Sequence, residues 1–124
     1  MNKDEKILIK YRIERSYQSF EEANYCFQGD MFNLTINRLY YSCFYIVTAL
    51  LICENFYPKT HKGTRNLFNQ QFILTKKIIE ELSEHYTKLF DLRQECDYKD
   101  FVEYNREDVE PLIEKTKDFL KVIE

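Results

Sequence analysis

Apolar side chains recur every three or four residues along most of the chain, the spacing of one face of an α-helix. The first such stripe predicts a helix over residues 4–28. Gly29 follows it as a candidate C-terminal stop, and Asp30 is a candidate N-cap for the next helix. The stripe consists of Ile9, Ile13, Tyr17, Phe20, Ala23 and Phe27.

A second helix is expected over residues 31–55. Its second half, residues 40–52, is apolar on nearly every side. A helix of this kind is surrounded by protein, so we expect it at the centre of the molecule or in a subunit interface. Pro58 keeps Tyr57 out of helical geometry and closes this helical region.

Two further helices are expected after a polar loop, a short one over residues 64–72 and a long one over residues 76–98 that Thr75 would cap. Arg93 occupies a position on the inward stripe of the long helix that an apolar residue would normally hold. His85 lies beside that stripe and is expected at the helix surface or in an interface. The stripe consists of Ile79, Leu82, Tyr86, Leu89, Arg93 and Cys96.

The last helix is expected to begin near Arg106, with Asn105 as its N-cap. Four long helices and one short helix predict an all-α protein, an up-and-down four-helix bundle with an extra short helix, as a single domain over residues 1–124. The buried face of the last helix would consist of Val109, Leu112, Ile113, Thr116, Phe119, Leu120 and Ile123.

The composition supports a helical domain and indicates the cellular compartment in which to expect it. The 124 residues include two Gly, two Pro and no Trp, against ten Tyr and ten Phe, which leaves few residues for the turns of a sheet. Cys26, Cys43, Cys53 and Cys96 follow neither a Cys-x-x-Cys spacing nor a Cys/His zinc spacing. We therefore expect reduced thiols in a cytoplasmic protein without a membrane span, and no metal or other cofactor.

Three polar insertions interrupt the apolar pattern, at residues 37–41, 59–63 and 93–98. If the two long helices that carry the first and third insertions pack side by side, their arginines point into one cleft, which the loop of the second insertion would cover. The net charge of −3 disfavours broad binding of nucleic acid but allows a local basic pocket for a phosphate or a base. The candidate ligand-binding residues are Arg38, Tyr41, His61, Lys62, Arg65, Arg93, Asp97 and Tyr98.

The order and spacing of these insertions resemble the HEPN domain family, helical proteins of prokaryotes that occur beside nucleotidyltransferases. The resemblance implies a homodimer, a nucleotidyltransferase partner protein, and a nucleotide or RNA as ligand. The residues that carry it are Asn37-Arg38-Leu39-Tyr40-Tyr41, Lys59-Thr60-His61-Lys62-Gly63, Arg65 with Phe68, Arg93 with Asp97-Tyr98, and the acidic stretch 100–104.

Ribonuclease members of that family carry Arg-x(4–6)-His late in a helix. Arg93 has the place of that arginine, but Tyr98, Lys99 and Asp100 stand where the histidine would be. The remaining catalytic candidates are Arg93 and His61, the histidine of the second insertion. The resemblance also suggests AMP transfer to a tyrosine, with Tyr98 and Tyr104 as acceptors.

Three hypotheses follow. The first is a nucleotide- or RNA-phosphate-binding module that acts with a nucleotidyltransferase in a toxin–antitoxin-like pair. The second is a metal-independent ribonuclease toxin that uses Arg93 and His61. The third is a non-catalytic interaction module, in which Arg93 and Asp97 form only an intrahelical ion pair, Arg38 is a structural clamp, and His61 is a solvated loop residue.

Overall fold

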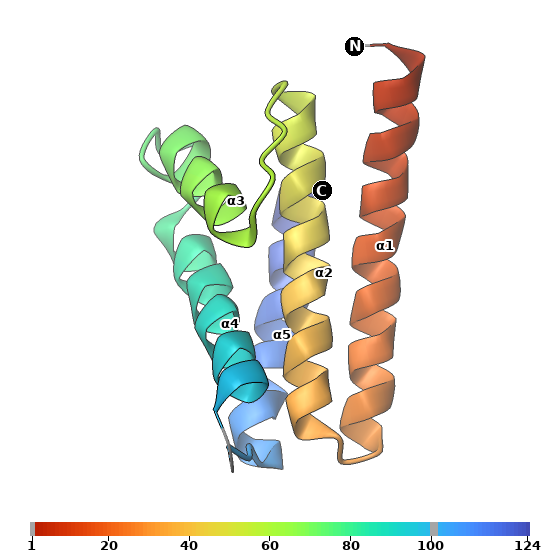
Figure 1. The fold of residues 1–124 in the computed structure, drawn as a ribbon, viewed down its shortest axis with the longest axis vertical. Helices are drawn as coiled ribbons and strands as arrows, with labels where there is room; N and C mark the ends of the chain where they lie inside the picture. Colours follow the sequence, from red (N-terminus) through yellow and green to blue (C-terminus); the bar gives the residue numbers. More distant parts are fainter. Residues whose placement is uncertain (1, 100–101) are drawn as a thin grey trace.

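The computed structural model describes residues 2–99 and 102–124, and every regular element in this part of the chain is helical, as predicted. Asp100 and Phe101, which belong to the acidic stretch noted above, lie outside the described residues. The long helices alternate in direction along the molecule (Figure 1). They are α1 (Lys3–Gln28), α2 (Phe32–Cys53), α4 (Glu80–Tyr98) and α5 (Arg106–Ile123), with the short α3 (His61–Phe68) and a π-helical turn η1 (Asn69–Ile73) between α2 and α4.

The turn between α1 and α2 differs from its predicted chemistry. Gly29 does end α1, but with a negative φ of −89°, and the left-handed residue is Asp30, at φ 59°. Asp30 is therefore not the N-cap of α2; that position belongs to Met31, which makes no side-chain cap. Aspartate tolerates the left-handed region better than most residues. Its carboxylate instead accepts a hydrogen bond of 2.6 Å from Arg106 Nη2.

Helix α2 is the central element, as its apolar second half predicts. It packs against α1, α3, α4 and α5 (Figure 1). By length and mean hydropathy it is also the one helix among the described residues that could cross a membrane, yet 61% of its most apolar window is buried by the other helices. Such burial is what the core helix of a soluble bundle has.

The region between α2 and α4 departs most from the predicted boundaries. Helix α3 begins at His61 rather than residue 64, because Thr60 caps it by accepting a 2.8 Å hydrogen bond from the Gly63 amide. Gly63 is thus a helical residue and not a loop hinge, and a Cβ there would lie 2.8 Å from Thr60 Oγ1. Residues 61–63 of the second insertion therefore form the start of a helix rather than a loop.

Helix α4 begins at Glu80, four residues later than predicted, and Thr75 is not its cap. The Thr75 hydroxyl donates to the Gln71 carbonyl, and Lys76 has a φ of 60°, which no α-helix continues. Ile79 is the N-cap of α4 and is 62% exposed, so it does not belong to the inward stripe.

Helix α5 begins at Arg106 behind a capping box of Asn105 and Asp108, as the sequence predicts. Its packing on α4 corrects the expectation for His85, which is buried rather than at the surface. The His85 Nε2 lies 2.8 Å from Thr116 Oγ1, whose own proton is donated to the Leu112 carbonyl. The two polar side chains therefore bond to each other within the core, while His85 Nδ1 has no hydrogen-bond partner among the described residues.

Candidate functional site

Arg93 of α4 lies against the aromatic side chains of α2. Its guanidinium carbon is 4.5 Å from the centre of the Tyr40 ring and 5.9 Å from that of Tyr41. The residue is only 9% exposed, and Phe90, one turn earlier on α4, packs against it at 5.9 Å. An arginine held over tyrosine rings gains cation–π attraction, which offsets part of the cost of burying its charge.

The hydrogen-bonding capacity of Arg93 is poorly used. Its partner is Asp97, at 3.5 Å between Nη1 and Oδ2, and the Asp97 side chain is 39% exposed. Arg93 Nε is buried without a hydrogen-bond partner among the described residues. A guanidinium has five N–H donors, so this group retains donors for an anion.

Arg38 of α2 also approaches the Tyr41 ring. Its guanidinium carbon is 5.2 Å from the centre of the Tyr41 ring. Its donors go to the Asn37 amide oxygen, at 2.6 Å from Nη2, and to Glu22 of α1, at 3.5 Å from Nη1. If Arg38 acts as a structural clamp, its partners are therefore Asn37 and Glu22.

His61, the first residue of α3, joins this group through Tyr40. The Nδ1 of His61 is 2.7 Å from the Tyr40 hydroxyl oxygen, and its ring lies 4.4 Å from that of Phe44. Burial, together with the positive charge of Arg93, lowers the pKa of His61 below its ordinary value. The imidazole is therefore neutral at neutral pH. Burial raises the pKa of Tyr40, so its hydroxyl keeps its proton.

Of the remaining candidates, Arg65 lies near Arg93, whereas Lys62 and Tyr98 do not contact this group. Arg65 of α3 packs its guanidinium 4.4 Å from the centre of the Phe90 ring, beside Arg93. Lys62 is exposed, and Tyr98 is 80% exposed at the end of α4. Neither makes a described side-chain contact with the others. We call the residues that the fold brings together, Arg38, Tyr40, Tyr41, His61 and Arg93, the Arg93 cluster.

Sequence reasoning missed the residue at the centre of this cluster. Tyr40 is fully buried, lies under Arg93 and bonds to His61. A signal was present: Tyr40 is four residues from both Ile36 and Phe44, so it belongs to the core face of α2, and a buried tyrosine hydroxyl needs a partner. Glu22 was also missed, since nothing local relates it to Arg38, sixteen residues away.

The chemistry open to the Arg93 cluster is anion binding with proton transfer nearby. Two guanidinium groups face one tyrosine ring, and they can bind phosphate oxygens by charge-assisted hydrogen bonds. A neutral histidine on the same tyrosine pair can accept or relay a proton. Within residues 2–99 and 102–124, no three His, Cys, Asp or Glu side chains gather as a metal site would require.

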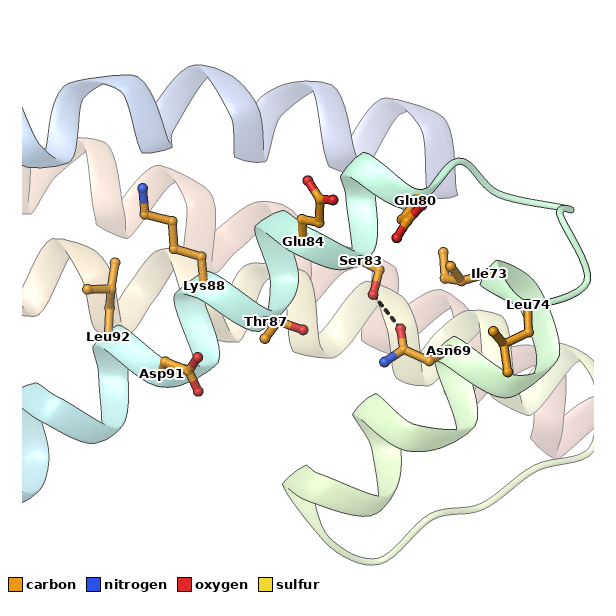
Figure 2. Close-up of a pocket in the computed structure, with 10 residues that line it drawn as sticks. All are labelled: Asn69, Ile73, Leu74, Glu80, Ser83, Glu84, Thr87, Lys88, Asp91 and Leu92. Atoms are coloured by element: carbon orange, nitrogen blue, oxygen red, sulfur yellow. Dashed lines mark hydrogen bonds between the residues drawn. The ribbon is translucent and has the colours of Figure 1, made fainter.

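A wider groove of about 610 Å³ lies elsewhere, between η1 and α4 (Figure 2). Its lining includes Glu80, Glu84, Asp91 and Lys88, with Leu74 at the rim (Figure 2). Ser83 donates a 2.5 Å hydrogen bond to Asn69 across it. No residue of the Arg93 cluster lines this groove, and its charge is mostly acidic, so it does not suit a phosphate.

Comparison with known proteins places these residues in a family. The chain is 35% identical to a "UPF0332 protein" of Thermotoga maritima, over 100% of this chain and 93% of that protein. It is 33% identical to "Putative toxin MJ0142" of Methanocaldococcus jannaschii, over 87% of this chain and 74% of that protein. A family model described as the HEPN domain matches residues 9–124. The chain therefore belongs to the HEPN domain family.

Proposed function

We propose that this HEPN protein binds a phosphate group of RNA or of a nucleotide at the Arg93 cluster. It acts as the toxin-like member of a pair whose other member is a nucleotidyltransferase. The name of the Methanocaldococcus jannaschii relative, which describes that protein as a putative toxin, supports the toxin-like part of this proposal. The homodimer and the partner protein come from the family resemblance.

The observation that carries the proposal is the state of Arg93. A guanidinium that is only 9% exposed normally has a closely bound carboxylate, because burial of an unpaired charge is costly. Here the carboxylate is 3.5 Å away on a side chain that is 39% exposed, and Nε has no described partner. A phosphate group would supply the missing negative charge and the missing acceptors.

Binding of a fluorescent single-stranded RNA, and of ATP and GTP as competitors, tests the proposal. Loss of a charge-assisted hydrogen bond costs about 1.5–3 kcal/mol, so we expect Arg93→Gln and Arg38→Gln to weaken binding by about tenfold or more. Arg106→Gln is the matched control, because Arg106 also lies on an aromatic ring, 4.5 Å from that of Phe27, and pairs with Asp30 outside the cluster. Equal affinity in wild type and both cluster variants would refute the proposal.

A second candidate, the metal-independent ribonuclease, is favoured by one contact. His61 and Arg93 both contact Tyr40, so the fold brings the two catalytic candidates to one place. In the tautomer whose Nδ1–H donates to the Tyr40 oxygen, Nε2 is free to take a proton from a ribose hydroxyl while Arg93 stabilises phosphate charge. RNA cleavage that is lost in both Arg93→Ala and His61→Ala would support this activity. Cleavage retained in either variant would exclude the assignment.

The two tyrosines suggested for AMP transfer differ in accessibility. The Tyr104 hydroxyl donates a 2.6 Å hydrogen bond to Glu95, whereas Tyr98 is 80% exposed. A nucleotidyltransferase partner therefore has direct access to the Tyr98 hydroxyl. Mass spectrometry of the chain after incubation with ATP and the partner would assign the modified residue, and Tyr98→Phe should abolish the added mass.

A further inference from the structure

A polar pocket lies beside His61, and Arg93 does not line it. The chain that follows α2 turns back along it before α3 begins (Figure 1), and this segment forms one wall of the pocket. The pocket has a volume of about 250 Å³ and lies between that segment, α1 and the second half of α2. Its apolar wall is made by Leu8, Phe44, Ile52 and Pro58.

The polar lining of this pocket is cationic. Arg12 of α1 and Lys59 of the turning segment both line it, and no aspartate or glutamate does. Among the ion pairs of the described residues, none involves Arg12 or Lys59. Among the described residues, the Arg12 side chain makes one long hydrogen bond, of 3.4 Å, to the Thr48 hydroxyl, and its guanidinium carbon lies 6.0 Å from the centre of the Tyr45 ring. Two cations thus share a small concave space without a carboxylate between them.

The neighbouring acid does not neutralise the pocket. Glu5 accepts a 2.5 Å hydrogen bond from the Tyr57 hydroxyl and does not line the space itself. Thr48 and Thr60 add hydroxyl groups to the lining, and His61 adds its ring. Thr60 and His61 also begin α3, and the amides of a first helical turn favour an anion.

We propose that this pocket binds a phosphate group, with Arg12 and Lys59 as its cationic ligands. Pockets that enclose a whole small ligand usually measure about 300–1,000 Å³, so a space of about 250 Å³ fits one phosphate group rather than a complete nucleotide. The attached sugar or chain would lie outside. The inference does not depend on phosphate binding at the Arg93 cluster, because the two sites share only His61.

An NMR titration of the ¹⁵N-labelled protein with inorganic phosphate, at neutral pH and constant ionic strength, tests this site directly. We expect saturable shifts of the amide signals of Thr60, His61 and Lys62. The double variant Arg12→Gln/Lys59→Gln should weaken the apparent affinity by about tenfold or more. Lys10→Gln is the matched control, since Lys10 is an exposed cation of the same helix that does not line the pocket.

The outcomes separate this site from the Arg93 cluster. Arg93→Gln should leave phosphate binding at Arg12 and Lys59 unchanged, whereas the double variant should lose it. Absence of saturable shifts at Thr60, His61 and Lys62, or an affinity of the double variant, read from these signals, within about twofold of wild type, would overturn the inference.

Further arms identify the source of the phosphate, using AMP, a short RNA with a 5′-phosphate and the same RNA with a 5′-hydroxyl. If wild type binds the RNA with a 5′-phosphate more tightly than the RNA with a 5′-hydroxyl, and the double variant shows no such difference, the occupant is an RNA end. Binding of AMP without binding of the phosphorylated RNA would support a free nucleotide.

Discussion

At the scale of single residues, the guanidinium of Arg93 presents a conflict between folding and binding. Its cation–π contact with Tyr40, at 4.5 Å, is worth about 0.5–2 kcal/mol, whereas burial of a charge without close partners costs several kcal/mol. We therefore expect Arg93→Met, which keeps the length and removes the charge, to retain the free energy of unfolding within about 1 kcal/mol or to raise it. The same variant should lose RNA binding.

Urea denaturation and an RNA-binding assay on the same variants measure the effects of Arg93 on stability and on binding. Asp97→Asn serves as the control for the ion pair, and because the Asp97 side chain is 39% exposed, its stability effect should also stay below about 1 kcal/mol. A loss of more than about 2 kcal/mol in Arg93→Met would mean that Arg93 is a structural residue, as the third hypothesis requires.

Because His85 is buried near two lysines, it should make the free energy of unfolding depend on pH. Burial, with the charges of Lys115 and Lys88, lowers the pKa of His85 to about 4, against an ordinary value of 6.5. The unfolded chain therefore binds a proton at higher pH than the folded protein does. The stability contributed by neutral His85 is complete above pH 6.5 and is lost as the pH falls towards 4.

At pH 5 this loss amounts to about 2 kcal/mol relative to pH 7. Carboxylates also titrate in this range, so the test compares the pH dependence of the free energy of unfolding in wild type and His85→Gln. We expect the variant to lose about 2 kcal/mol less between pH 7 and pH 5. Parallel curves for the two proteins would show that His85 is not protonated on unfolding in this range.

At the scale of secondary-structure elements, α5 offers a clean test of capping. The Asn105 side chain accepts a 2.9 Å hydrogen bond from the Asp108 amide, and the Asp108 carboxylate accepts a 3.1 Å hydrogen bond from the Asn105 amide. Asn105→Ala should lower the free energy of unfolding by about 1 kcal/mol. Asn2→Ala removes an equivalent capping box on α1, with a 2.8 Å hydrogen bond from the Glu5 amide, and should cost a similar amount. Thermal denaturation of both variants provides the comparison.

Helix ends were predictable where a local residue sets them. Gly29 and Asn105 act through neighbours within four positions, so the sequence alone placed the end of α1 and the start of α5 correctly. The start of α4 was not predictable in this way. A threonine at position 75 is a plausible cap, but the π-helical turn at Asn69–Ile73 and the left-handed Lys76 arise from how this segment packs back onto α3 and α4.

The same distinction applies to the candidate site. The approach of Arg38, Arg93 and His61 followed from helix spacing and the motif order, and the structure brings these three together. The exclusion of Tyr98 from that group and the ion pair of Arg38 with Glu22 depend on the rotation of α4 and α1 about their axes. Periodicity gives the buried face of a helix but not its neighbours, which is also why the His85–Thr116 contact was missed.

At the scale of the whole molecule, a negative net charge coexists with local groups of arginine. The chain has a net charge of −3, yet arginines from four helices lie against aromatic side chains around α2 and α4. A continuous row of rings connects part of this set, since the Tyr41 and Tyr45 rings are 6.0 Å apart and Arg15 lies 5.1 Å from Tyr45. In an acidic protein, such local arginine groups favour a few local phosphate contacts over non-specific binding.

The salt dependence of RNA binding tests this distribution. Each neutralised phosphate of a single strand contributes about −0.7 to the slope of log K against log salt concentration. Contacts by Arg38 and Arg93 alone therefore predict a slope of about −1.4, and Arg93→Gln should reduce its magnitude to about 0.7. Fluorescence anisotropy of a labelled single-stranded RNA at several salt concentrations measures both values. A slope as steep as about −5 would require about seven phosphate contacts. If Arg93→Gln left such a slope unchanged, the RNA would lie on a broad surface away from the cluster.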